Sequence, residues 1–130
     1  DVLDELERGA AATVAVSKVT EEHLRILAPS LIATSCWRKL SLTRGRLDSS
    51  HIDELARIML FTAARVQVLD LSWNRINGEG AKRLIQLIGH HPTLRELNLQ
   101  HNAVAAAGGE EIGALLSGAD VRIQTINLDG

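Results

Sequence analysis

Three histidines are the first candidates for chemistry, because an imidazole can bind a metal ion or move a proton near neutral pH. His90 and His91 are adjacent and directly precede Pro92, and His101 follows in the next segment. Adjacent histidines rarely point at one ion, and no Cys or carboxylate lies nearby at a metal-ligand spacing. We therefore expect no metal site, and we interpret His90 and His91 as solvated loop residues.

Cys36 is the only cysteine, so it is the one candidate for a thiol nucleophile. No local Cys/His signature surrounds it, and its place before an expected strand favours a small buried apolar residue. A single cysteine cannot form an internal disulfide, which favours a reducing compartment and predicts a cytoplasmic protein.

Gly78 and Gly80 flank Glu79 in a short stretch that is a candidate phosphate-binding loop. The stretch matches neither the dinucleotide fingerprint nor the P-loop, because both need further Gly or Lys residues at fixed offsets. We interpret it as the start of a helix. With no catalytic constellation, the sequence predicts that the chain is not an enzyme and needs no cofactor.

Composition narrows the range of partners. The net charge is −2, with 45% hydrophobic and 2% aromatic residues, so a sizeable aliphatic core is expected. Binding to phosphate polymers normally needs a concentrated basic excess, and no apolar run is long enough to span a bilayer. We expect neither nucleic-acid nor membrane partners. The strongest charge feature is a group of five basic residues, Lys18, Arg38, Lys39, Arg44 and Arg46. They could form a basic patch, and the alternative interpretation is an ordinary solvated edge.

An internal repeat supplies the elements that would position these residues. Segments 66–76 and 94–104 share the pattern Leu-x-x-Leu-x-Leu-x-x-Asn-x-Ile, with Val allowed at the apolar positions. Segment 37–47 fits with Trp37 in place of the first Leu and Gly45 in place of Asn. The central apolar residue recurs at spacings of 29, 28 and 29 residues, at Leu40, Leu69, Leu97 and Ile126.

Apolar alternation predicts strands near 13–17, 38–43, 67–72, 95–100 and 124–128, where Val14 and Val16 form a weaker first copy. Between them the apolar period changes to 3.6, which predicts helices opened by Thr20, Ser50 and Asn77 and closed by Gly89. Pro29 should kink or end the first helix.

Stacked strand–helix units predict an α/β fold: an open, curved solenoid with a parallel sheet on its concave face and helices on its convex face. We expect a single domain with repeats near 13–36, 37–65, 66–93 and 94–122 and a partial repeat at 123–130. Because the chain starts at Asp1 and stops inside a strand pattern, we expect it to be part of a longer protein.

From Leu69 to Leu99 the chain resembles ribonuclease-inhibitor-like leucine-rich repeats, through Leu-Asp-Leu-Ser-Trp-Asn-Arg-Ile and Pro-Thr-Leu-Arg-Glu-Leu-Asn-Leu. This class also occurs in nucleotide-binding innate-immune receptors and Ran GTPase-activating proteins. The resemblance implies a protein-binding module or scaffold by analogy of fold. Two alternatives stay open: a regulatory repeat segment of a nucleotide-binding receptor, and a Ran-type GTPase-activating fragment.

The repeat also predicts where a partner binds. Leu positions face the core, so the third, fifth and seventh positions point to the concave side, and the eighth lies on the rim. We expect a protein partner to contact the rim residues Arg44, Trp73 and His101. Three strand residues would set its orientation, namely Lys39, Asp70 and Glu96.

The ninth position has a structural assignment. There the side-chain amides of Asn74 and Asn102 should satisfy backbone groups that have left the β-ladder. The outer strand near Ile126 has no following repeat to cover it, which predicts self-association through exposed solenoid ends.

Overall fold

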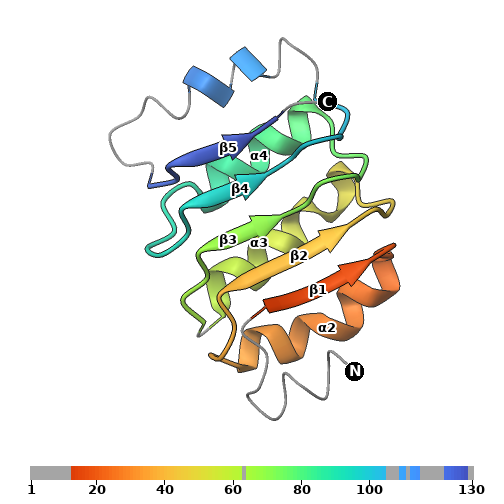
Figure 1. The fold of residues 1–130 in the computed structure, drawn as a ribbon, viewed down its shortest axis with the longest axis vertical. Helices are drawn as coiled ribbons and strands as arrows, with labels where there is room; N and C mark the ends of the chain where they lie inside the picture. Colours follow the sequence, from red (N-terminus) through yellow and green to blue (C-terminus); the bar gives the residue numbers. More distant parts are fainter. Residues whose placement is uncertain (1–12, 63, 105–108, 111, 115–121, 129–130) are drawn as a thin grey trace.

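The computed structural model describes residues 13–62, 64–104, 109–110, 112–114 and 122–128. Among these residues one parallel sheet runs in sequence order, β1-β2-β3-β4-β5, and every neighbouring pair of strands is parallel (Figure 1). Its strands are β1 (Thr13–Ser17), β2 (Lys39–Thr43), β3 (Val68–Asp70), β4 (Glu96–Asn98) and β5 (Thr125–Asn127). The predicted parallel order of strands is confirmed.

The helices all lie on one side of the sheet and leave its other face open (Figure 1). They are α2 (Glu21–Ala33), α3 (Ile52–Phe61), which follows the short 3₁₀ helix η1 (Ser49–His51), and α4 (Gly78–Ile88). Each crossover between parallel strands must pass back over the sheet, which places α2, α3 and α4 behind it. The α/β repeat architecture is therefore confirmed, and we call the uncovered side the open face.

Strand register agrees with the predicted columns. Leu40 pairs with Leu69, Leu69 with Leu97 and Leu97 with Ile126, so the recurring apolar residue forms one row across the sheet. Val14 pairs with Leu40, so the first expected strand is in register with the second. A one-residue slip would turn this row toward solvent, so the apolar row itself specifies the register.

Trp37 explains one departure from the repeat. It is completely buried, and its indole Nε1 donates a hydrogen bond of 3.2 Å to the carbonyl oxygen of Leu31 in α2. A leucine at this position would fill less space and leave that carbonyl without its indole donor. The tryptophan therefore joins the last turns of α2 to the entry of β2.

Gly45 explains the other departure. A Cβ at this position would lie 2.0 Å from the carbonyl oxygen of Val19 and 2.6 Å from its Cγ1 atom. Since the backbone of Val19 occupies the place of a side chain, the asparagine found in later repeats cannot be accommodated. Gly45 is required here by close approach of the preceding repeat.

The observed helix ends agree only in part with those predicted from the sequence. Thr20 caps α2, and Asn77 caps α4, which ends at Ile88 just before Gly89. The prediction that Ser50 opens a helix is wrong, because the carboxylate of Asp48 accepts the Ser50 amide hydrogen at 2.9 Å and η1 starts first. Of the two expected effects of Pro29, a helix end is wrong, because α2 continues to Ala33.

The sequence also predicts a last helix that carries Leu115 and Leu116 and ends before Gly118, and it places Asp129 at a seventh position. These four residues lie outside the described residues. In the part of the chain that is described, no helix is both long and apolar enough to cross a membrane.

Candidate partner-binding face

The eighth position of each repeat adopts the same unusual backbone conformation. Lys18, Arg44, Trp73 and His101 have φ values of 57°, 56°, 61° and 57°. Non-glycine residues in this left-handed region cost about 1–2 kcal/mol each, because Cβ crowds the backbone. The shared conformation presents four side chains in one column where the chain leaves the sheet.

Three of these side chains stack on one another. The rings of Trp73 and His101 have centroids 3.9 Å apart and planes inclined by 18°, and Arg44 Cζ lies 5.1 Å from the Trp73 ring centroid. Cation–π contacts at exposed sites contribute about 0.5–1 kcal/mol. Trp73 nevertheless remains 46% exposed. The structure thus brings together the three rim residues expected from the sequence, as a preformed column.

The open face itself carries the other three predicted residues. Lys39, Val68, Glu96 and Thr125 form one row, and Ser41, Asp70, Asn98 and Asn127 form a second row two residues further along the strands. Asp70 is partly used within the fold, since its Oδ1 accepts the Ser72 amide hydrogen at 3.0 Å. These rows consist mainly of short polar side chains, so a partner can approach the strands closely.

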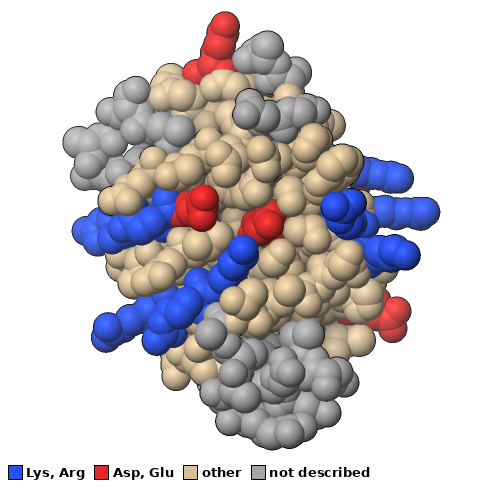
Figure 2. All heavy atoms as spheres, viewed as in Figure 1, with Lys and Arg blue, Asp and Glu red and all other residues tan. Residues whose placement is uncertain are grey.

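Charge is unevenly distributed over this face. Figure 2 shows acidic atoms near its middle and basic atoms gathered at two opposite sides. The acidic strand residues are Asp70 and Glu96, whereas arginines and lysines precede the strands at one side and follow them at the other. The basic patch expected from the sequence is therefore divided, with Arg38 and Lys39 at the start of β2 and Lys18, Arg44 and Arg46 beyond the strand ends.

Arg38 and Arg95 have a local role that the sequence analysis missed. Arg38 donates to the carbonyl oxygens of Trp37 and Ser35 at 3.0 and 2.9 Å. Arg95 donates to the equivalent carbonyls of Leu94 and Pro92 at 3.0 and 3.1 Å. Because arginine recurs at the second repeat position, the sequence could have indicated this shared role.

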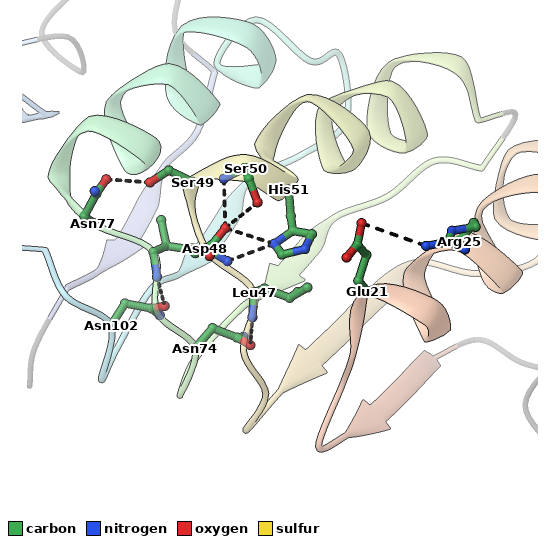
Figure 3. Close-up of polar contacts among 11 residues, drawn as sticks. Glu21, Arg25, Leu47, Asp48, Ser49, Ser50, His51, Asn74, Asn77 and Asn102 are labelled. Carbon is green, nitrogen blue, oxygen red and sulfur yellow. Dashed lines mark hydrogen bonds and ion pairs between the residues drawn. The ribbon is translucent and has the colours of Figure 1, made fainter.

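The two ninth-position asparagines connect neighbouring repeats (Figure 3). Asn74 donates to the carbonyl oxygens of Leu42 and Leu71 at 2.8 and 2.9 Å, and its Oδ1 accepts the Leu47 amide hydrogen at 3.3 Å. Asn102 repeats the arrangement one unit later, donating to Leu71 and Leu99 at 2.9 and 3.1 Å and accepting from Ile76 at 3.0 Å. Each amide holds the exit of its own strand against the previous repeat.

His91 corrects the expectation of solvated loop histidines, because its residue is only 6% exposed. Nδ1 accepts amide hydrogens from Thr93 and Leu94 at 3.2 and 3.1 Å, and Nε2 lies 3.0 Å from the carbonyl oxygen of Met59. These partners select the neutral tautomer with hydrogen on Nε2. Burial lowers the pKa of His91, the bond to Met59 opposes this effect, and the charge of Arg95 lowers the pKa further.

His91 therefore acts as a structural group that joins the loop before β4 to α3. Within the residues that the structure describes, no three His, Cys, Asp or Glu side chains lie close enough together to hold a metal ion.

The helical side offers two shallow hollows as competing sites. One, of about 380 Å³, has an apolar part formed by Leu24, Ala28 and Pro29 of α2 and reaches His51. The other, of about 310 Å³, lies at the start of α4 beside Ser49 and Gly80. Neither contains the stacked aromatic and cationic groups found at the eighth position.

The fold and the asparagine column together define a leucine-rich-repeat solenoid. A family profile described as "Leucine Rich repeat" matches residues 66–84 and 90–113. These two segments of the chain therefore match leucine-rich repeats.

One relative shares part of the sequence. A Ran GTPase-activating protein of Drosophila melanogaster is 42% identical over 48 residues, which are 37% of this chain and 8% of that protein. The match therefore spans only a small part of the relative's length.

Two solved structures share the fold at low sequence identity. The structure titled "Leiomodin-1 Actin-Binding Site 2 (ABS2)" has a TM-score of 0.82 and 18% identity, covering 99% of this chain and 78% of that chain. The tropomodulin C-terminal domain of Caenorhabditis elegans has a TM-score of 0.78 and 13% identity, covering 99% and 81%.

Proposed function

We propose that this chain is a non-catalytic protein-interaction module that binds its partner on the open face of the sheet. The observation that carries the proposal is the preformed column of Arg44, Trp73 and His101 beside rows of short polar side chains. Trp and Arg are enriched among residues that dominate binding energy, and a column already ordered before binding loses less conformational entropy. Lys39, Asp70 and Glu96 would orient the partner by charge.

The comparisons support this class of function. The leiomodin-1 structure is named for an actin-binding site, so one protein with this fold is described as binding another protein. We further propose a ribonuclease-inhibitor-like repeat in a cytoplasmic scaffold, which the long repeats and the lone Cys36 support.

Site-specific photocrosslinking tests where the partner binds. A crosslinking amino acid would replace Asn98 on the open face or, as a control, the exposed Gln86 on α4. We expect a protein to be captured from cell extract at position 98 and not at position 86. Capture only at position 86 would contradict the proposal.

Affinity for the captured partner then tests the anchor column. Trp73→Ala should weaken binding by about tenfold or more, the scale of an interface hot spot. Arg57→Ala and Arg83→Ala are matched controls, because both arginines are exposed on the helical side and should leave the affinity unchanged. A larger effect of the controls than of Trp73→Ala would place the interface on the helices.

A GTPase-activating function is a second candidate, favoured by the 48-residue match to the Drosophila Ran GTPase-activating protein. Hydrolysis of GTP by purified Ran would be measured with and without the chain. Acceleration would support this candidate, and an unchanged rate would remove it.

A further inference from the structure

Four cations lie beyond the strand ends. Lys18, Arg44, Arg46 and Arg75 are all exposed, and none of them forms an ion pair with a carboxylate in the described residues. Together with Trp73 and His101 they form a surface that we call the strand-exit rim. Figure 2, viewed as Figure 1, shows basic atoms at the side of the face toward which the strands run.

Among the described residues, three arginines on the helical side differ from the rim cations because each is paired with a carboxylate. On the helical side, Arg25 lies 3.9 Å from Glu21, Arg57 lies 3.3 Å from Glu54, and Arg83 lies 2.8 Å from a carboxylate of α3. A surface whose cations are left without carboxylates has an unbalanced positive potential. Such a surface attracts a ligand of opposite charge.

The rim also has an excess of hydrogen-bond donors. Lysine and arginine only donate, and the indole Nε1–H of Trp73 makes no hydrogen bond with a described residue. The left-handed backbone at the eighth position holds three of these residues, Lys18, Arg44 and Trp73, in one column. Carboxylates are acceptor-only groups and match this donor set.

We propose that the strand-exit rim binds an acidic segment of a partner polypeptide, an inference that rests on the proposed protein-binding function. Neighbouring strands lie about 4.8 Å apart, so crossing four repeats requires roughly five extended residues. Asp70 and Glu96 on the adjoining open face would repel a polymer charged at every unit, and this favours a protein segment over nucleic acid.

Fluorescence of Trp73 provides the readout, because Trp37 is completely buried and inaccessible to quenchers. An unpaired basic surface should raise the ratio of iodide to caesium quenching at least about threefold above the ratio measured for free N-acetyltryptophanamide. Replacing Arg44 and Arg75 with Gln should reduce this ratio. A ratio in the unmodified chain equal to that of free N-acetyltryptophanamide would show that the rim carries no excess positive potential.

Binding is tested with three probes at about 20 mM salt. They are a synthetic peptide of about 12 residues that alternates Glu and Ser, the matching Lys and Ser peptide, and a thymidine oligonucleotide of similar length. We expect the Glu peptide alone to change Trp73 emission. Binding should weaken about fivefold or more in the Arg44→Glu, Arg75→Glu variant and on raising salt.

The matched control reverses two charges on the helical side, as Arg57→Glu with Arg83→Glu, and should bind the Glu peptide as the unmodified chain does. The Arg-to-Gln variant, checked for an unchanged urea unfolding midpoint, guards against a folding defect. Equal binding of the Lys peptide, an equal loss in the control, or tighter binding of the oligonucleotide would each overturn the inference.

Outcomes for the inference and for the proposed function are separable. If a partner captured at position 98 loses affinity in Trp73→Ala but keeps it when the charges of Arg44 and Arg75 are reversed, the proposed open-face binding stands and the rim inference fails. If the Glu peptide binds at the rim but no partner is captured on the open face, the proposed face is wrong and the rim remains an acidic-segment site.

Discussion

Replacement of the ninth-position asparagines tests the link between repeats most directly. Asn74 makes two donor bonds shorter than 3 Å and is 7% exposed, whereas Asn102 is only half-buried. A buried hydrogen bond contributes about 1 kcal/mol net, and each polar group left unpaired adds a desolvation cost. We expect Asn74→Ala to lower the free energy of unfolding by about 2–4 kcal/mol and Asn102→Ala by about 1–3 kcal/mol.

Urea unfolding followed by circular dichroism measures both values. Asn98→Ala is the matched control, since this asparagine lies on the open face and accepts a single hydrogen bond, from Gln100 at 3.0 Å. Asn74→Asp should cost more than Asn74→Ala, because a carboxylate would face the carbonyl oxygens that the amide now binds.

Unchanged unfolding midpoints would refute this account of the asparagine column. Coupling between the two positions is also expected, because the carbonyl oxygen of Leu71 accepts from both amides. The double alanine variant should therefore cost about 1 kcal/mol more than the sum of the single variants.

Three further predictions concern stability and assembly. Gly45→Ala should lower stability by at least about 1–3 kcal/mol through the clash with Val19, whereas Gly109→Ala, which has open space, should not, as urea midpoints would show. Folded His91 has a lowered pKa, so the unfolded state binds the proton more tightly; stability should be complete above about pH 6.5 and fall as pH drops toward the folded value. His91→Gln should reduce this dependence and His90→Gln should retain it. The outer edge of β5 should produce concentration-dependent association in sedimentation velocity, and strictly monomeric behaviour would contradict that prediction.

Repeat-level features could be predicted because they depend on periodicity. Apolar spacing of two within strands, combined with an interval of 28 or 29 residues, specified the row of Leu40, Leu69 and Leu97 and hence the register. The same arithmetic placed Arg44, Trp73 and His101 in one column. It did not predict their stacking, because ring orientation depends on side-chain torsions and on the positive φ at each residue.

Features that depend on a contact between particular repeats were missed. The burial of His91 arises from Met59 in the previous unit, and no local pattern reports a partner so far away in sequence. Gly45 is required by the Val19 backbone, which is likewise a long-range contact. Asp48, not Ser50, is the N-cap, because η1 adds a turn before α3. Helix boundaries of this kind depend on small energy differences.

The left-handed backbone at the eighth position also sets the stability of the fold against the side chains that form the binding column. Glycine is the residue that this backbone accepts at least cost, so Trp73→Gly should relieve strain of about 1 kcal/mol. The same change removes the exposed indole from the centre of the column. Loss of the contacts with Arg44 and His101 offsets that gain, so a selection for thermal resistance would favour glycine first at Lys18, for which no such stacking contact is found among the described residues. A selection for binding would retain Trp73.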